Sequence, residues 1–311
     1  ELIPALNKYP GRIMFCSDDK HPDDLIKGQI NILAARAVNL EYDLMDILEA
    51  ASVTPVKHYR LDVGLLQKGD PADFIVVRDL TRMRVLETWI DGKRVFDGEK
   101  VNIPEITLPA INNFNPYTLG AENFELPGSK KKIPVIEAAE GSLVTQKTFI
   151  EPDIRDGNIQ PDPSRDILKI AVVNRYKQAR PALDLVRGFG LKNGAIASSV
   201  AHDAHNIVAV GTSDHYLSRA VNMIMHSRGG ISAAGSGHED ILPLPVAGII
   251  SDRPGEETAT AYKRLTRSAR EMGSKLSAPY MLLSFMALEV IPSLKITDKG
   301  LFDVDKFEFI T

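Results

Sequence analysis

The sequence has little cysteine, few aromatic residues and no excess of positive charge. Cys16 is the only cysteine among 311 residues, which excludes an intramolecular disulfide and is typical of a reducing compartment. The net charge of -4 offers no basic excess to neutralise phosphates, so nucleic acid is not expected as a partner. No apolar run reaches the length of a membrane span, and no signal peptide is evident. We therefore expect a cytoplasmic protein with no membrane partner.

The remaining composition is typical of a globular protein with substantial cores. Hydrophobic residues make up 44% of the chain, charged residues 25% and aromatic residues 6%. The length indicates one large domain or two of ordinary size.

A short stretch near the start carries a dense group of potentially reactive side chains. The apolar residues 13–16 have the length of a buried strand, in which Cys16 is expected to be a small buried residue. Asp18 and Asp19 follow at its end, with His21 close behind. Adjacent carboxylates at the end of a buried strand repel each other, so a cation, hydrogen-bond donors or solvent must compensate them. Two interpretations stay open: a functional group at a strand end, or a turn before a helix.

A second polar cluster lies far along the chain, after another apolar segment. It reads Ser198-Ser199-Val200-Ala201-His202-Asp203-Ala204-His205-Asn206. The imidazoles of His202 and His205 could bind a metal, orient a carboxylate or hydrogen-bond the edge of a nucleobase. Asp203 and Asn206 could equally satisfy backbone groups in a polar turn between two strands. Spacing alone favours the polar turn.

Hydrophobic periodicity and turn residues predict the elements of the first hundred residues. Amphipathic helices are expected over 23–38 and 43–52, the second ended by Pro55. A strand is expected before residue 78, followed by a hairpin of residues 85–90 and 93–96 around Asp91-Gly92. From about residue 98 to 133, prolines and asparagines indicate a long surface connection.

The rest of the chain resembles a complete domain of layered helices and strands. Strands are predicted at 135–138, 143–149, 168–174, 183–189, 194–200, 207–211, 230–234 and 241–250. Helices are predicted at 214–227, capped by Ser213, and at 255–272. Residues 281–291 are strongly apolar, and their periodicity does not distinguish a strand from a helix.

Several of these segments together resemble one known family. The stretch Phe15-Cys16-Ser17-Asp18-Asp19-Lys20-His21-Pro22-Asp23-Asp24-Leu25 resembles the last barrel strand and loop of adenine deaminases, in the amidohydrolase superfamily. Lys68-Gly69-Asp70-Pro71-Ala72-Asp73-Phe74 resembles part of the amidohydrolase β-sandwich. Ser199-Val200-Ala201-His202-Asp203-Ala204-His205-Asn206 resembles a signature of the adenine deaminase C-terminal domain. The resemblance runs in order from residue 11 to the C-terminus.

The resemblance implies an α/β fold with four parts. Residues 1–62 would be the last strand and helices of a metal-dependent (β/α)8 TIM barrel, and 63–100 part of the β-sandwich. Residues 101–133 would be a linker, and 134–311 a separate, layered α+β C-terminal domain. The family's His-x-His pair on the first barrel strand is absent, since every histidine lies at position 21 or beyond. Roughly the N-terminal half of the family's chain is therefore expected to be missing.

The resemblance also implies an activity, the hydrolytic deamination of adenine to hypoxanthine and ammonia in purine salvage. Asp18 would bind the metal and take the proton of the attacking water. The implied cofactor is a divalent metal, manganese or iron, in a centre that is often dinuclear. The substrate-binding residues that the resemblance implies are Asp19, His21, His202, Asp203 and His205. Because the other metal ligands are absent, we expect these residues alone not to deaminate adenine.

Two other functions stay open. One is a different amidohydrolase-type aminohydrolase or a cyclic amidase, although residues 134–311 argue against it because a generic amidohydrolase ends after its β-sandwich. The other is a non-catalytic module that binds purine or serves as a partner subunit. For assembly we expect a homo-oligomer such as a dimer, or pairing with the missing N-terminal part.

Overall fold

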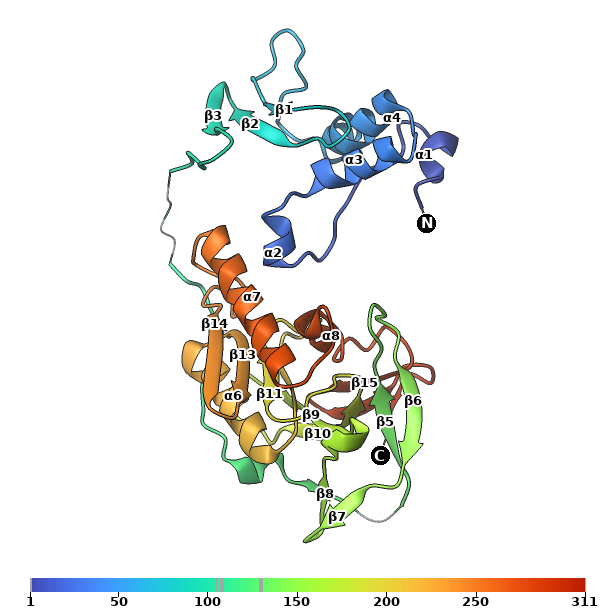
Figure 1. Ribbon diagram of the computed structural model, residues 1–311, viewed down its shortest axis with the longest axis vertical. Helices are drawn as coiled ribbons and strands as arrows, with labels where there is room; N and C mark the ends of the chain where they lie inside the picture. The colour runs from blue at the N-terminus through green and yellow to red at the C-terminus, as the bar shows by residue number, and fades with distance from the viewer. Residues whose placement is uncertain (1, 105, 107–108, 129–130, 311) are drawn as a thin grey trace. The chain divides into compact units, whose positions relative to one another are not determined.

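The computed structural model describes residues 2–104, 106, 109–128 and 131–310. The chain divides into two compact units, unit 1 at Glu1–Leu108 and unit 2 at Pro109–Thr311 (Figure 1). Both units contain helices and strands, so the protein is of mixed α/β class. The described strands form open sheets and no closed barrel. No helix in the described ranges is both long and apolar enough to cross a bilayer.

The helices of unit 1 differ in their bounds from those that the sequence predicts. They are α1 (Ala5–Lys8), α2 (Pro22–Leu25), α3 (Ile30–Asn39), α4 (Leu44–Leu48), a π-helical turn (Glu49–Val53) and α5 (Thr54–Tyr59). The single helix predicted over 23–38 is wrong. The segment forms two helices, α2 and α3, separated near Gly28, whose φ of +139° is not helical. Pro55 does not end the second helix. It lies in the first turn of α5, where the missing N–H of proline is tolerated.

The strand predicted at residues 13–16 is also wrong. This segment is not part of any sheet, and the Phe15 N–H donates a hydrogen bond to the Ala50 carbonyl at 3.2 Å. That carbonyl belongs to the π-helical turn, in which its usual donor would be residue 55, a proline without an N–H. A parallel strand needs neighbouring strands, and the described residues of unit 1 provide none beside this segment. Cys16, predicted to be buried, is exposed.

A small antiparallel sheet completes unit 1. Its strands are β1 (Phe74–Val77), β2 (Val85–Ile90) and β3 (Lys93–Phe96), in that order. Asp91 and Gly92 have φ values of 49° and 71° and form the two-residue turn between β2 and β3, as predicted. The Asp73 carboxylate accepts the backbone N–H groups of Asp91 and Gly64, each at 2.7 Å, and these hydrogen bonds lower the pKa of Asp73.

Unit 2 is built on an eight-stranded, largely antiparallel sheet. Its strands are β5 (Ile133–Glu137), β6 (Gln146–Ile150), β9 (Leu168–Val173), β10 (Ala182–Arg187), β11 (Ala195–Ser198), β12 (Ile207–Gly211), β13 (Gly230–Gly235) and β14 (His238–Pro243). The spatial order is β14-β13-β11-β12-β9-β10-β5-β6, and only β10 and β5 pair in parallel. The strand predicted over 241–250 ends at Pro243, because Pro243 and Pro245 cannot donate ladder hydrogen bonds.

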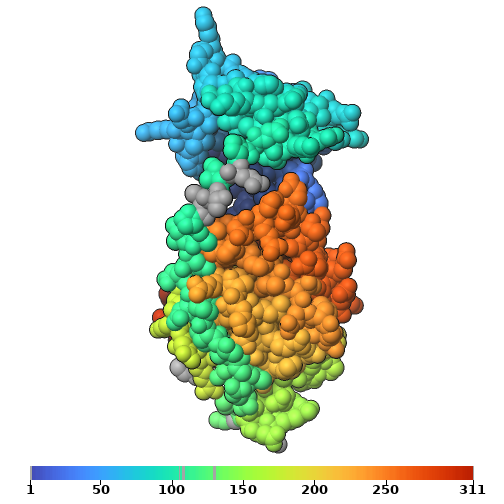
Figure 2. All heavy atoms as spheres, turned by 90° about the vertical axis from the view of Figure 1, so that its left-hand side faces the viewer, coloured from blue at the N-terminus to red at the C-terminus, as the bar shows by residue number. Residues whose placement is uncertain are grey.

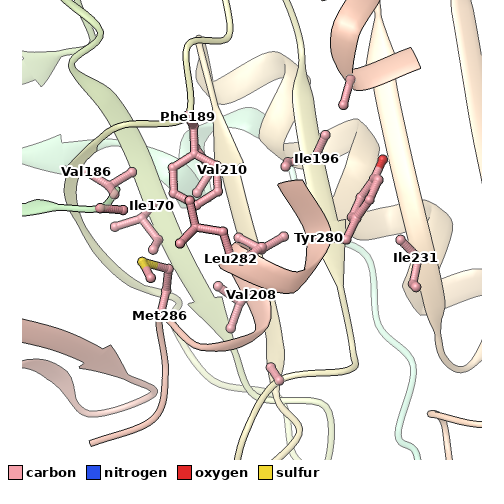
Figure 3. Packing of buried hydrophobic residues seen from close by; sticks show 14 of the residues in the cluster. Ile170, Val186, Phe189, Ile196, Val208, Val210, Ile231, Tyr280, Leu282 and Met286 are labelled. Atoms are coloured by element: carbon pink, nitrogen blue, oxygen red, sulfur yellow. The ribbon is translucent and has the colours of Figure 1, made fainter. Parts of the chain in front are cut away.

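Helices cover both faces of this sheet. The helix α6 (Asp214–Ser227) lies on one face, and α7 (Gly255–Glu271) and α8 (Pro279–Ser284) pack on the other. A hydrophobic core lies on each face of the sheet, and alternate residues of β9 point into one or the other. Ile170 packs with α7 and α8, whereas Ala171 packs with α6. Figure 3 shows Leu282 and Met286 among the sheet side chains of the core beneath α7 and α8. The apolar segment 281–291 is thus partly helical, and it is buried against the sheet rather than part of it.

Residues 109–127 form an arm that packs along unit 2 (Figure 2). The arm includes a 3-10 turn (Ala121–Phe124) and β4 (Leu126–Pro127). The expectation of a surface connection does not hold for Phe114, Leu119 and Phe124, which are buried in the core beside α6. Inside that core, the fully buried Lys169 donates hydrogen bonds to the Phe124 carbonyl at 3.0 Å and to the Asp214 carboxylate.

Two small sheets complete unit 2, and the sequence patterns predict neither. One consists of β15 (Leu294–Thr297), β16 (Gly300–Asp303) and β17 (Glu308–Phe309), in that order. The other joins β4 to β8 (Asn158–Gln160) and β7 (Asp153–Arg155).

Candidate functional site

Asp18 and Asp19 lie on an exposed turn of unit 1. Asp18 has a φ of 47°, and its Oδ1 accepts the backbone N–H of Asp19 at 2.8 Å. Its own backbone N–H donates to the Cys16 Sγ at 3.4 Å. Both carboxylates are exposed, so solvent is available to compensate their charge. The sequence placed these acids at the end of an extended segment and left open whether a cation, hydrogen-bond donors or solvent compensates them; in the structure they face solvent.

Side-chain hydrogen bonds connect the rest of this loop to the residues just before α3. The Gln29 Nε2 donates to the Ser17 Oγ at 3.0 Å, and the Lys20 ammonium donates to the Gly28 carbonyl. His21 stands at the N-cap position of α2, without a side-chain capping hydrogen bond. Just after α2, the Lys27 ammonium donates a hydrogen bond to the Asp24 carboxylate at 2.6 Å, which lowers the pKa of Asp24. Asp24 therefore has a local structural partner.

The described residues do not form a metal centre by themselves. Within them, no three His, Cys, Asp or Glu side chains come together in an arrangement that could hold an ion. Asp18 and Asp19 supply carboxylate oxygens, but a catalytic first-row metal site generally uses three or more protein ligands with several imidazoles among them. The donor set that the described residues offer is thus incomplete for such a metal.

His202, Asp203 and His205 lie together on the loop between β11 and β12. The two imidazole centroids are 5.8 Å apart, and the His202 ring packs at 4.8 Å from Phe285. The His205 Nδ1 accepts the Ala201 N–H at 3.4 Å, so the neutral ring carries its proton on Nε2. Asp203 is exposed, whereas both histidines are half-buried. The loop therefore presents two imidazoles side by side, with a carboxylate at its tip.

Backbone hydrogen bonds fix this loop from three sides. The His202 N–H donates to the Ser284 carbonyl at 3.1 Å, and the Tyr176 hydroxyl donates to the Ala204 carbonyl at 2.8 Å. The buried Asn206 side chain accepts the Arg175 N–H at 3.4 Å. The polar-turn interpretation of Asn206 is therefore correct in this respect, since its side chain satisfies a backbone group.

Burial sets the protonation of His205. Desolvation lowers the pKa of its imidazole, and the neighbouring His202 and Arg175 lower it further because a second positive charge is unfavourable there. His205 is thus neutral at neutral pH, with a donor on one nitrogen and an acceptor on the other.

The same loop forms one wall of a pocket in unit 2, which we call the C-terminal pocket. Its volume is about 380 Å³. The residues that line it are Val172, Ala201, His202, Ala204, His205, Asn206, Ala287, Glu289, Thr297, Asp298, Lys299, Phe302, Phe307 and Phe309. Sequence analysis missed the residues from 287 onward, although the density of phenylalanines after residue 300 was a visible signal.

Comparison with known proteins identifies the relatives of both units. The family model described as "Adenine deaminase C-terminal domain" matches residues 142–308, and the amidohydrolase family model matches residues 2–95. A protein of Salinibacter ruber named adenine deaminase is 49% identical over 312 aligned residues, covering 100% of this chain and 57% of the relative. Proteins with the same name from a Sulfurovum species and from Methanosarcina barkeri are 49% and 45% identical, each across 99% of this chain. The chain spans 57% and 58% of the length of these two relatives.

Proposed function

The chain belongs to the adenine deaminase C-terminal domain family, and from this premise we propose that it is part of an enzyme that hydrolyses adenine to hypoxanthine and ammonia. The observation that carries the proposal is the match of full-length relatives with that name to both units of this chain. We also propose a cytoplasmic location, since a single cysteine suits a reducing compartment.

Asp18 is the proposed catalytic carboxylate. In the reaction, water adds to C6 of adenine and ammonia leaves, so a base must take a proton from the water and an acid must deliver one to the leaving nitrogen. The exposed Asp18 carboxylate has an oxygen that accepts the Asp19 N–H, which orients it on its turn. Asp18 would hold the proton between the two steps, while Asp19 would accept a hydrogen bond from the purine ring.

The family resemblance further suggests a divalent metal, manganese or iron, in a centre that is often dinuclear. The described residues of this chain do not complete such a site. As part of the (β/α)8 barrel that we propose for residues 1–62, Asp18 would need ligands from other segments of the whole enzyme. His21, His202, Asp203 and His205 are proposed to line the purine pocket, and the enzyme is proposed to be a homo-oligomer.

A substitution series tests this proposal. The chain would be fused to the N-terminal segment of a relative, the segment that has no counterpart in this chain. Hypoxanthine formation from adenine would then be measured with manganese present. We expect Asp18→Asn to lower the rate about a hundredfold or more, since that is the usual contribution of a positioned acid or base. Asp62→Asn, at an exposed site of the same unit, is the matched control and should keep the full rate. Full activity in the Asp18→Asn variant would refute the assignment.

A second candidate function is a non-catalytic subunit that binds purine. It is favoured by the incomplete set of metal ligands in the described residues. The same series distinguishes it, because such a subunit would bind adenine without forming hypoxanthine when joined to the N-terminal part.

A further inference from the structure

The C-terminal pocket has the size and walls of a small-molecule site. Its volume of about 380 Å³ falls in the range of ligand pockets. Its walls come from three segments that are distant in sequence: the His202–His205 loop, the segment after α8, and the sheet of β15, β16 and β17. All of them belong to unit 2.

One wall is aromatic and partly open to solvent. The Phe302 ring is buried and lies edge-to-face with Phe307 and Phe309, at centroid distances of 5.3 Å and 5.1 Å. Phe307 and Phe309 are 72% and 43% exposed. Exposed phenylalanine rings at a pocket are unfavourable in water, so a flat apolar partner that covers them would be stabilised.

The polar lining residues offer hydrogen bonds without a positive cluster. His202 and His205 present imidazoles, and the Asp298 carboxylate is held in place by the Asn174 Nδ2 at 2.9 Å. Among the lining residues, all within the described part of unit 2, Glu289 and Asp298 are acids and Lys299 is the one permanent cation. This charge balance disfavours phosphate and favours a neutral ligand that donates N–H groups.

We propose that the C-terminal pocket binds a free aminopurine base, stacked on the exposed rings of Phe307 and Phe309 with its amino group donating to Asp298. Aromatic rings bind nucleobases through their faces, and a carboxylate is a strong acceptor for an exocyclic amine. The inference rests on the proposed function only for its choice of adenine as the probe. It assigns a base-binding site to unit 2, in addition to the contact with the purine ring that is proposed for Asp19.

Calorimetric titration of the whole chain with adenine tests the inference. A chelator in the buffer removes free metal, so binding is measured without turnover. We expect one saturable site per chain, with hypoxanthine and adenosine monophosphate binding at least about tenfold more weakly, because the first lacks the amino group and the second brings phosphate to an acidic pocket. Equal affinity for all three, or no saturable binding of adenine, would overturn the inference.

Two matched pairs of variants locate the site. Phe307→Ala should weaken adenine binding about tenfold or more, as loss of a base–aromatic stack does, whereas Phe149→Ala should not, since Phe149 is 59% exposed but does not line this pocket. Asp298→Asn should weaken binding by a similar factor, whereas Asp305→Asn, on the exposed turn between β16 and β17, should not. Unchanged affinity in both Phe307→Ala and Asp298→Asn would refute the site.

These outcomes are separate from those of the proposed function. Binding that is lost in Phe307→Ala but retained in Asp18→Asn would support the pocket whether or not adenine is deaminated. Loss of deamination in Asp18→Asn, with no adenine binding to the chain alone, would support the proposed function and overturn the inference.

Discussion

Asp184 lies on β10, on the sheet face that carries the core beneath α7 and α8. Its neighbours on that face of the strand, Ala182 and Val186, pack in this core. The Asp184 Oδ1 accepts the backbone N–H of Leu185 at 2.8 Å, but burial outweighs this hydrogen bond and raises the pKa of the carboxyl to about 7. The folded protein therefore holds a proton that the unfolded chain would release near its ordinary pKa of 3.8.

This residue predicts a pH dependence of stability. Below pH 4 the carboxyl is protonated in both states and imposes no cost, and as the pH rises toward 7 only the unfolded chain ionises freely, so stability falls. Asp184→Asn stays neutral and should lack this decline. We expect it to match the native protein near pH 4 and to be more stable by about 2–4 kcal/mol at pH 8. Chemical denaturation at both pH values measures the difference.

The exposed Asp156→Asn is the control for that prediction, because it sits on the turn between β7 and β8. It should leave the pH dependence of stability unchanged. Equal stability of Asp184→Asn and the native protein at pH 8 would show that the Asp184 carboxylate is not penalised by burial.

At the residue scale, the sequence identified reactive side chains but not their surroundings. Asp18 and Asp19 were visible as adjacent acids after an apolar segment, and His202 and His205 as a cluster after another. Their exposure could not be predicted, because it depends on which strands lie beside the segment rather than on the segment itself. Asp298 and Phe307 were not predicted as pocket residues, because neither belongs to a recognisable local motif.

At the scale of elements, the sequence predicted correctly the turns and helix ends that a few neighbouring residues determine. Asp91 and Gly92 adopt the positive φ values of a tight turn, and the Ser213 hydroxyl accepts the Tyr216 N–H at 3.2 Å at the start of α6. The bounds of β12 and α6 match their predictions. The arm was predicted only as a connection, since its buried residues are separated by polar residues and proline. Its backbone also hydrogen-bonds at Leu119 to side chains about a hundred positions away.

Asn222 of α6 is the main polar anchor of that arm. Its Oδ1 accepts the Leu119 N–H at 3.0 Å, and its Nδ2 donates to the Leu119 carbonyl at 2.8 Å. Asn222→Ala should lower the free energy of unfolding by about 1–3 kcal/mol, because both buried backbone groups would lose a partner. Hydrogen exchange should become faster in residues 117–124.

The exposed Asn193→Ala is the matched control and should change neither the unfolding energy nor exchange in the arm. Equal stability of Asn222→Ala and this control would show that the hydrogen bonds between Asn222 and Leu119 do not stabilise the arm.

At the scale of the whole molecule, unit 2 has its own sheet, two cores and a pocket, whereas the described residues of unit 1 carry acids that do not form a complete set of metal ligands. The layered architecture of unit 2 followed from its alternating strands and capped helices. The absence of a His-x-His pair predicts an incomplete metal site in unit 1, and this stays a prediction. The chain spans little more than half the length of relatives such as the Salinibacter ruber protein, so the proposed reaction belongs to the whole enzyme.

The most direct test is the rate of ammonia release from adenine, measured with manganese for the chain alone and for the chain mixed with the N-terminal part of a relative. We predict no turnover by the chain alone and a steady rate from the mixture, because Asp18 needs ligands that the described residues do not supply. Steady, manganese-dependent turnover by the chain alone would contradict this account of the site.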